Sequence, residues 1–309
     1  MNRSAAIAVC IPTLHREDGL ARALESVAAQ RLEGTGIDAL VAIVVNNDPA
    51  DRTPHATAAR IAAATGLAIE VLDEPERGTA PPRNRALARA REVAALVAFL
   101  DDDEEAPERW LASLLATKRD TGAEIATGTV RSRFVAPPPA WAAAVFARPE
   151  HAQGSLRPWA FTGNVLFDAS LLERLSTWFD PRFRQGEDRH FFARLAATGA
   201  RIAWCASDAP VELVPPARVD PAWIARRMHA IGRAVTAIER DTPAARFAGP
   251  RNLAKGLAWI AIGWTHRVAA ALKRDTVTAI RARGAASYGR GLVEGALGAS
   301  PSAPTSAGG

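Results

Sequence analysis

Short apolar runs alternate with stretches of helical periodicity over the first third of this 309-residue chain. Each run is only a few residues long and ends at a proline or at polar residues, as buried strands do. The predicted strands span 6–11, 39–45, 67–72 and 93–100. The predicted helices between them span 20–27, 56–64 and 82–91. This β-α-β-α-β-α-β order predicts an α/β fold, with a mostly parallel sheet and helices on both of its faces.

The pattern becomes mixed after residue 107. We predict helices at 110–117 and 141–146, and strands at 124–134 and 201–205. Beyond residue 215 the chain is mostly helical. We therefore divide it into an α/β domain at 1–215, a C-terminal helical extension at 216–297 and a tail at 298–309. The tail consists mainly of Ser, Ala, Pro and Gly, a composition that predicts disorder.

Composition and charge restrict the classes of molecule that this protein is expected to bind. Apolar residues make up 48% of the chain and charged residues 23%, which is typical of a globular protein. The formal net charge is +5, but no basic run with interleaved aromatic residues is present, so we do not expect nucleic acid as a partner. Anionic nucleotide sugars or an anionic membrane surface fit this charge better.

The location predicted from the sequence is the cytoplasm. Cys10 and Cys205 both lie in apolar runs, which favours reduced core residues over a disulfide. The apolar stretch at the start is short and ends at Pro12, unlike a secretory signal. The best candidate for a membrane-spanning helix, 256–265, has half of the roughly 20 apolar residues that a span needs.

Polar residues follow three of the four predicted strands, at 13–18, 46–51 and 101–105. In open α/β sheets, ligands bind beyond the carboxyl ends of the strands. The sequence therefore predicts a ligand site at this edge of the sheet.

Five adjacent carboxylates, at 101–105, follow the fourth strand. Their mutual repulsion suggests a cation as partner, and hard carboxylate oxygens suit Mg²⁺ or Mn²⁺. The alternative is a solvated acidic turn that caps the helix starting near Pro107. The position directly after a buried strand favours the cation.

Three further segments carry weaker signals. Gly186, Glu187 and Asp188 precede an apolar helix, where a carboxylate can also be only a helix cap. The basic, glycine-containing segment at 77–85 opens a helix and favours phosphates, although arginines at such a place are often simply solvated. The small polar break at 162–164 can equally be an ordinary turn.

Taken together, these motifs resemble the GT-A-fold family 2 glycosyltransferases, over roughly residues 5–215. The loop at 46–53 matches the family's nucleotide-contacting loop at Asp51 and Thr53, but Asn46 stands where an aspartate is common. The other matching segments are 11–16, 78–84, 99–107, 162–164 and 186–195. The segment 212–227 further resembles bacterial exopolysaccharide enzymes of the succinoglycan-biosynthesis type.

The resemblance implies an inverting transfer of a hexose from a nucleoside-diphosphate sugar to an acceptor hydroxyl. Asp101 and Asp103 would hold a divalent metal, Mn²⁺ or Mg²⁺, at the diphosphate, with Asp103 the stronger ligand candidate. Asp188 would accept the proton of the acceptor hydroxyl, and Glu187 would position the acceptor. The implied acceptor is a carbohydrate or lipid-linked saccharide in bacterial exopolysaccharide or cell-surface glycan synthesis.

The resemblance also assigns the remaining site residues. Those implied to bind the nucleotide sugar are Pro12, Thr13, Arg16, Asn46, Asp48, Arg83, Asp101 and Asp102. Gly163 and Asn164 would lie on the acceptor side. An amide can both donate to and accept from a pyrimidine edge, so Asn46 is compatible with a UDP-sugar, while dTDP- and GDP-sugars stay open.

The sequence leaves two alternative functions open. A sugar-nucleotide pyrophosphorylase can share a related α/β core, but its first loop is usually rich in glycine, and this loop has no glycine before Gly19. A non-catalytic nucleotide-binding protein would have no need of the carboxylates at 101–103 and 188.

The C-terminal extension contains one amphipathic stretch, at 253–272. Its bulky apolar residues recur at steps of three and four and so line one face of a helix. They are Leu253, Leu257, Ile260, Trp264, Val268 and Leu272, widened by Trp259 and Ile262. With cations near its ends, this pattern is typical of an interfacial helix, which would place the enzyme at the inner face of the plasma membrane. The alternative is that the stripe packs against the catalytic domain.

Overall fold

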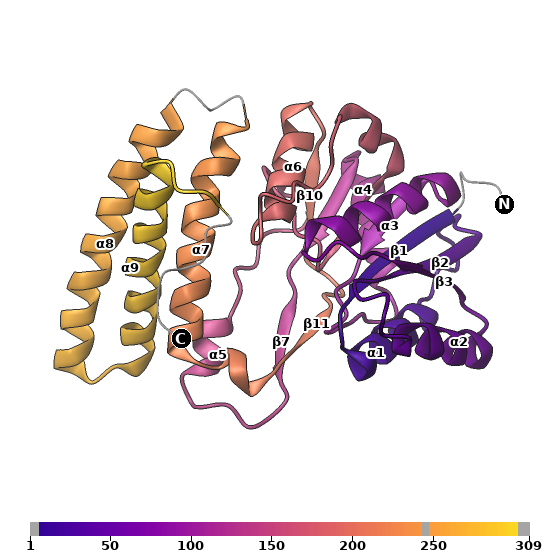
Figure 1. Ribbon diagram of the computed structural model, residues 1–309, viewed down its shortest axis with the longest axis horizontal. Helices are drawn as coiled ribbons and strands as arrows, with labels where there is room; N and C mark the ends of the chain where they lie inside the picture. Colours follow the sequence, from indigo (N-terminus) through magenta and orange to yellow (C-terminus); the bar gives the residue numbers. More distant parts are fainter. Residues whose placement is uncertain (1–5, 243–246, 302–309) are drawn as a thin grey trace. The chain divides into compact units, whose positions relative to one another are not determined.

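The computed structural model describes residues 6–242 and 247–301 and shows an α/β protein with a large central sheet flanked by helices (Figure 1). The predicted fold class is confirmed. Residues 302–309, most of the predicted disordered tail, lie outside the described residues.

The central sheet has eight strands in the order β3-β2-β1-β4-β9-β6-β10-β8. Their bounds are β1 Ala6–Thr13, β2 Ala39–Asn46, β3 Ala68–Asp73, β4 Leu96–Phe99, β6 Ile125–Gly128, β8 Leu156–Arg157, β9 Val165–Asp168 and β10 Ile202–Cys205. Strands β1 to β4 are parallel to one another, and β6 is parallel to β10. Strand β9 runs antiparallel to both β4 and β6, so the carboxyl ends of β1, β2, β4, β6 and β10 share one edge of the sheet.

Helices cover both faces of this sheet because its strands are apolar on both sides. In β1, Ile7 and Val9 belong to one core cluster and Ala8 and Cys10 to the other, as the two-residue period of a strand requires. One cluster includes residues of α1, α2 and α4, and the other includes residues of α3 and α6. The bounds are α1 Glu17–Ala28, α2 Thr53–Thr65, α3 Ala80–Val93, α4 Trp110–Thr121 and α6 Glu187–Ala197.

The two cysteines occupy the core as expected. Cys10 and Cys205 are free and buried. Burial raises the pKa of both thiols, which keeps them in the neutral form.

The prediction of a single strand at 124–134 is wrong. The chain leaves the central sheet after β6 and enters a small sheet of order β5-β11-β7, formed by Glu104–Glu105, Val211–Val214 and Arg131–Phe134. Gly128 ends β6 at a point where other segments approach the backbone closely. A Cβ there would lie 2.5 Å from the Cys205 carbonyl oxygen and 2.7 Å from the Asn164 amide nitrogen. The sequence at 124–134 alternates like one strand, and no local signal marks where the chain passes from one sheet to the other.

The C-terminal part of the chain forms three long helices, α7 Pro221–Arg240, α8 Ala248–Lys273 and α9 Thr276–Ala296 (Figure 1). Helix α9 packs against both α7 and α8. The shorter elements are α5 Ala142–Phe146 and the 3₁₀ turns η2 Ala169–Arg174 and η3 Pro216–Arg218. Within the described residues, no helix is long and apolar enough to cross a bilayer.

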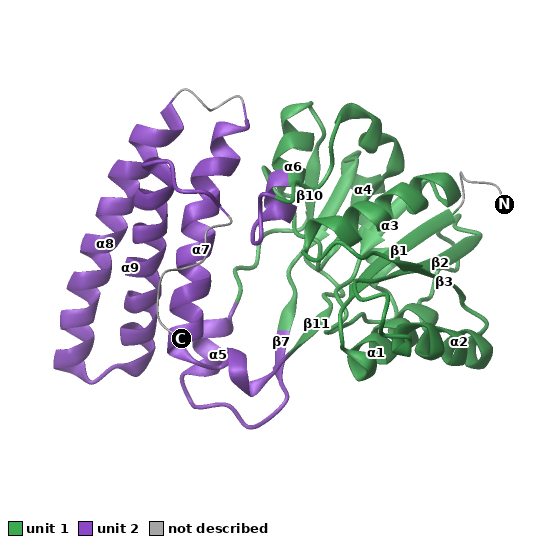
Figure 2. Ribbon diagram, viewed as in Figure 1, with its two compact units in different colours: residues 1–131, 148–181, 191–213 green, residues 132–147, 182–190, 214–309 purple. Residues whose placement is uncertain are grey.

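The chain folds into two compact units (Figure 2). One consists of residues 1–131, 148–181 and 191–213, and the other of residues 132–147, 182–190 and 214–309. The functional domains expected at 1–215, 216–297 and 298–309 remain predictions, since a division by contacts does not assign function.

Candidate active site

The loop that follows β4 is tied to the loop that follows β1. Asp102 is buried, and its carboxylate accepts hydrogen bonds from the Thr13 hydroxyl at 2.8 Å and from an Arg16 Nη1 at 2.8 Å. Burial raises the pKa of Asp102 to about 6, although the positive charge of Arg16 and the hydrogen bond from Thr13 oppose the rise. Asp102 therefore holds the two loops together at the carboxyl edge of the sheet. Pro12, also predicted to bind nucleotide, lies within β1 opposite Val45.

The two aspartates predicted to hold the metal each lie beside an arginine. Asp103 Oδ2 is 2.8 Å from Arg16 Nη1, and Asp101 Oδ1 is 3.1 Å from Arg83 Nη2. Both carboxylates remain partly accessible, with side-chain exposures of 17% for Asp103 and 32% for Asp101. In the described part of the chain, no group of three His, Cys, Asp or Glu side chains close enough to share a metal ion includes Asp101 or Asp103. Two carboxylates plus substrate phosphates are a common set for Mg²⁺, and the two arginines are suited to the same phosphates, so these residues fit a metal–diphosphate group.

Glu104 connects this loop to the segment predicted to lie on the acceptor side. Its side chain is buried, and its Oε2 accepts a hydrogen bond of 3.0 Å from the backbone N–H of Asp101. Burial, together with the negative charge of Asp101, raises the pKa of Glu104 well above its ordinary value. A Cβ at Gly163 would lie 2.4 Å from Glu104 Oε1, so the close approach requires glycine.

Asn164 is an internal anchor. It is 1% exposed, and its Oδ1 accepts a 2.8 Å hydrogen bond from the indole of Trp110. Its Nδ2 donates to the Thr129 carbonyl at 2.7 Å. The amide fixes the segment at 162–164 against the sheet, and both ends of this amide are engaged within the protein.

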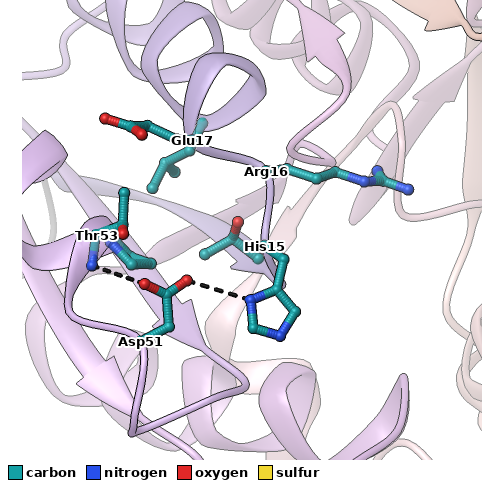
Figure 3. Close-up of a pocket in the computed structure, with 8 residues that line it drawn as sticks. His15, Arg16, Glu17, Asp51 and Thr53 are labelled. Carbon is teal, nitrogen blue, oxygen red and sulfur yellow. Dashed lines mark hydrogen bonds and ion pairs between the residues drawn. The ribbon is translucent and has the colours of Figure 1, made fainter.

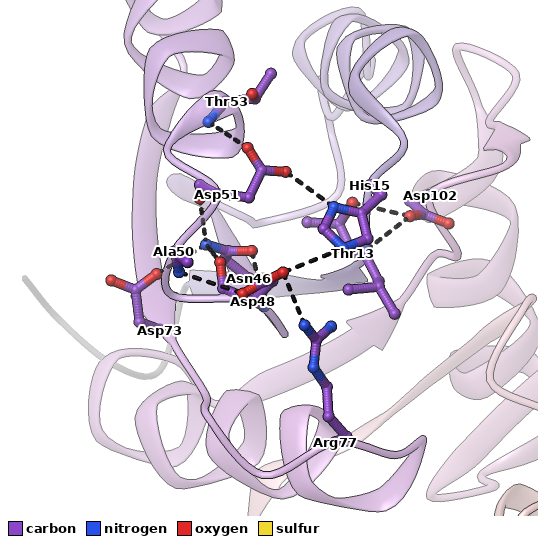
Figure 4. Close-up of polar contacts among 11 residues, drawn as sticks. Thr13, His15, Asn46, Asp48, Ala50, Asp51, Thr53, Asp73, Arg77 and Asp102 are labelled. Atoms are coloured by element: carbon purple, nitrogen blue, oxygen red, sulfur yellow. Dashed lines mark hydrogen bonds and ion pairs between the residues drawn. The ribbon is translucent and has the colours of Figure 1, made fainter.

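The loop after β2 is built around a second buried amide (Figure 4). Asn46 is fully buried, and its Nδ2 donates to the carbonyls of Asp48 and Asp51 and to Asp73 Oδ1. Its Oδ1 accepts the backbone N–H of Asp48. Both ends of the amide are thus engaged within the loop, and Asn46 sets the loop's shape. The sequence identified the residue but gave no sign of this burial.

Asp48, in the same loop, faces an arginine and a histidine (Figure 4). Its Oδ2 lies 2.7 Å from Arg77 Nη2 and 3.1 Å from His15 Nε2. The hydrogen bond from Arg77 lowers the pKa of Asp48. His15 also lies 3.3 Å from Asp51 and has a positive φ of 54°. Reasoning from the sequence missed His15, because nothing local shows that it meets residues more than thirty positions further along.

A pocket of about 240 Å³ opens between the loops that follow β1 and β2 (Figure 3). The residues that line it are Thr13, His15, Arg16, Glu17, Leu20, Asp51, Thr53 and Pro54. Two residues predicted to bind the nucleotide, Thr13 and Arg16, thus lie at one hollow with the unpredicted His15.

The Glu-Asp pair lies on a separate element, at the start of α6. Gly186 precedes it with a φ of 81°, a conformation that favours glycine. Glu187 is buried, and Asp188 is half-buried in the first turn, where its Oδ1 accepts the N–H of Arg189 at 2.6 Å. Further along, Phe191 and Phe192 are fixed in the hydrophobic core.

An aromatic cluster precedes the segment at 162–164, and the sequence gave no hint of it. Trp159 lies 4.8 Å from Phe161 and 6.1 Å from Trp204 between ring centroids. The Arg157 guanidinium is 5.1 Å from the Trp159 ring. Phe161 is 39% exposed. Because Trp204 lies near the carboxyl end of β10, the cluster belongs to the same edge of the sheet as Asp101.

Residues 8–174, just over half of the chain, match the model of the family described as Glycosyl transferase family 2. The chain belongs to this family. It is a glycosyltransferase, and the predicted family resemblance and enzyme class are confirmed.

Individual relatives agree with this assignment. The chain is 28% identical over 232 residues to the succinoglycan biosynthesis protein ExoM of Rhizobium meliloti (strain 1021), covering 74% of this chain and 72% of ExoM. The mannosyltransferase PcManGT from Pyrobaculum calidifontis, in complex with GDP-Man and Mn²⁺, is similar in structure with a TM-score of 0.66 at 21% identity, covering 94% of this chain and 86% of PcManGT. S. aureus TarS 1–349 in complex with UDP-GlcNAc has a TM-score of 0.56 at 17% identity, covering 93% of this chain and 90% of that one.

Proposed function

We propose that this family 2 enzyme catalyses a metal-dependent, inverting transfer of a hexose from a nucleoside-diphosphate sugar to an acceptor hydroxyl. One observation carries the proposal. Asp101 and Asp103 lie at the carboxyl edge of the sheet, each beside an arginine, in a loop that Asp102 ties to Thr13. Two carboxylates on one loop, each paired with an arginine, suit a ligand bearing both phosphates and a divalent cation.

On the donor side, Asp101 and Asp103 would hold Mn²⁺ or Mg²⁺, and Arg16 and Arg83 would exchange their carboxylate partners for the diphosphate oxygens. The metal supplies a Lewis acid that stabilises negative charge on the leaving nucleoside diphosphate. PcManGT, a mannosyltransferase of similar fold, binds GDP-Man and Mn²⁺, which supports this choice of cofactor.

The nucleoside would enter the pocket between the loops after β1 and β2. Asn46 would act indirectly, since its amide is engaged within the loop, and Asp48 with Arg77 would form the nearest polar rim. A UDP-sugar is our first choice, supported by the binding of UDP-GlcNAc to TarS. The binding of GDP-Man to PcManGT supports testing GDP-sugars beside it.

Asp188 is our candidate for the general base. A carboxylate in the first turn of a helix is fixed in direction by the helix, and α6 is itself anchored through Phe191 and Phe192. Asp188 would take the proton of the acceptor hydroxyl as that oxygen attacks the anomeric carbon, opposite the leaving group. Glu187, which is buried beside it, would orient the acceptor.

For the acceptor, we infer a carbohydrate or lipid-linked saccharide of bacterial exopolysaccharide or cell-surface glycan synthesis. The similarity to ExoM supports this pathway class. The aromatic cluster around Trp159 supports a saccharide, because large aromatic rings offer flat contact area. Gly163 and the half-exposed Phe161 would border the acceptor. We place the enzyme in the cytoplasm at the inner face of the plasma membrane, where a lipid-linked acceptor would be found.

The experiment that tests this function is slow donor hydrolysis. Purified enzyme is incubated with UDP-, dTDP- and GDP-hexoses, with Mn²⁺ or with excess chelator, and release of nucleoside diphosphate is followed. The expected result is metal-dependent release from one base class, with no exchange of pyrophosphate into the donor. Pyrophosphate exchange would instead indicate a nucleotidyltransferase, and donor binding without hydrolysis would indicate a non-catalytic nucleotide-binding protein.

A further inference from the structure

Helix α8 packs through its small residues. The buried positions along it are Asn252, Gly256, Gly263 and Ala270. A Cβ at Gly256 would lie 2.7 Å from the Gly289 carbonyl oxygen of α9, so the two backbones approach more closely than larger side chains allow. The contact of α8 with α9 is thus made by small residues, whereas the sequence offered packing of the bulky stripe on the catalytic domain as the alternative to membrane binding.

The bulky apolar residues of α8 point to solvent instead. Those exposed are Leu257 at 57%, Trp259 at 41%, Ile262 at 41%, Trp264 at 55%, Val268 at 59% and Leu272 at 83%. An ordinary surface helix carries polar residues on the face opposite its packing face. With 3.6 residues per turn, Leu257, Trp264, Val268 and Leu272 fall on one side of the helix. Trp259 and Ile262 fall on the other flank, and Trp259 contacts Tyr288 of α9. A contiguous apolar surface of this kind marks an interaction site.

The charge of the α8–α9 hairpin, residues 248–296, points to the partner. Helix α8 contains no Asp or Glu. The hairpin has eight Lys and Arg and two Asp and Glu, a net charge of +6, whereas the whole chain has +5. The remainder of the chain therefore carries −1, and the whole positive excess of the protein lies on this hairpin. Of the α8 cations, Arg251 is paired with Glu239 of α7, whereas Lys255 lies near the same end and Lys273 at the other end.

We propose that the α8–α9 hairpin docks on an anionic bilayer, with α8 lying in the plane of the interface. Leu257, Trp264, Val268 and Leu272 enter the boundary between headgroups and acyl chains, and the positive charge of the hairpin attracts the anionic headgroups. Tryptophans such as Trp264, with Arg267 5.3 Å from its ring, suit this boundary because they combine an apolar body with a polar edge. A second protein chain would also cover the apolar face, but it would not account for the concentration of positive charge on the same hairpin.

This inference rests on the proposed location of the acceptor at a membrane, but its test needs no transfer reaction. The full-length protein is floated with vesicles of pure phosphatidylcholine and with vesicles of equal parts phosphatidylcholine and phosphatidylglycerol. The wild type should float with the anionic vesicles, remain behind with the neutral ones, and lose binding as salt is raised.

Two matched pairs of variants separate the apolar and the electrostatic parts. Leu257→Gln with Trp264→Gln should weaken anionic-vesicle binding at least about tenfold, whereas Val135→Gln with Leu156→Gln, which removes exposed apolar side chains elsewhere, should not. Lys255→Glu with Lys273→Glu should weaken binding similarly, whereas Arg60→Glu with Arg119→Glu, an equal change of net charge outside the hairpin, should leave it nearly intact.

Circular dichroism and donor hydrolysis accompany each variant. If the α8 variants keep their fold and their hydrolysis rate but lose flotation, the docking surface is established independently of the catalytic proposal. If the wild type ignores anionic vesicles, or if light scattering shows a dimer that Leu257→Gln with Trp264→Gln converts to a monomer, the membrane proposal is overturned in favour of a protein interface.

Discussion

Gly163→Ala tests how tightly the loop at 101–105, proposed to hold a metal, is coupled to the segment at 162–164, proposed to contact the acceptor. The new methyl group would lie 2.4 Å from Glu104 Oε1 and 3.2 Å from its Cδ. The Glu104 carboxylate cannot retreat freely, because it is buried and its Oε2 accepts the backbone N–H of Asp101 at 3.0 Å. Overpacking at a buried position costs about 1–3 kcal/mol, which corresponds to a fall of a few degrees or more in Tm for a domain of this size.

The substitution should also disturb the candidate site, since a shift of Glu104 would displace the backbone of Asp101, to which it is hydrogen-bonded. We therefore expect Gly163→Ala to lower both Tm, measured by calorimetry, and Mn²⁺-dependent affinity for nucleoside diphosphate, measured by titration. In a Glu104→Ala background the same substitution should cost much less, a coupling on the order of 1 kcal/mol or more. An equal loss of stability in the two backgrounds, or an unchanged Tm and affinity in the single variant, would show that Gly163 and Glu104 are not coupled.

Three further results are expected. Asp103→Ala should abolish transfer and remove Mn²⁺-dependent binding of nucleoside diphosphate in titration calorimetry; wild-type activity in excess chelator would contradict the metal role. Asp188→Asn cannot take a proton at neutral pH and should lower turnover at least about a hundredfold with little change in donor affinity, and turnover within a factor of about three would make Asp188 only a helix cap. Trp110→Phe leaves the buried Asn164 Oδ1 without its indole donor and should cost about 1–3 kcal/mol in chemical denaturation; an unchanged midpoint would show that the anchor is dispensable.

The sequence predicted the elements whose signal is local. Strand β1 and its neighbours are apolar on both faces, so short runs ending at Pro12 or Asn46 were sufficient to find them. Strand β9 and the break at Gly128 depend on contacts with strands distant in sequence, and no local pattern records them. The periodicity of 253–272 correctly identified a helix, but it could not show that small residues, rather than bulky ones, form the packed face.

Prediction of the candidate site from the sequence had the same limit, because local patterns do not record contacts between distant segments. The residue types at 101–103 predicted carboxylates at a strand end, and the structure places them there. Burial was not visible in the sequence, so Asn46 and Asn164 were expected to contact ligands, whereas their amides are engaged within the protein. His15 and the aromatic cluster of Trp159 and Trp204 arise from chain segments that only folding brings together.

The central claim is that the loop at 101–103 binds a nucleoside-diphosphate sugar through a divalent metal. The most direct measurement is calorimetric titration of UDP, dTDP and GDP into the wild type with Mn²⁺, with Mg²⁺ and with chelator. We expect saturable binding of one nucleotide that requires the metal and is lost in Asp103→Ala. Binding of equal strength in chelator, or retained in Asp103→Ala, would contradict it.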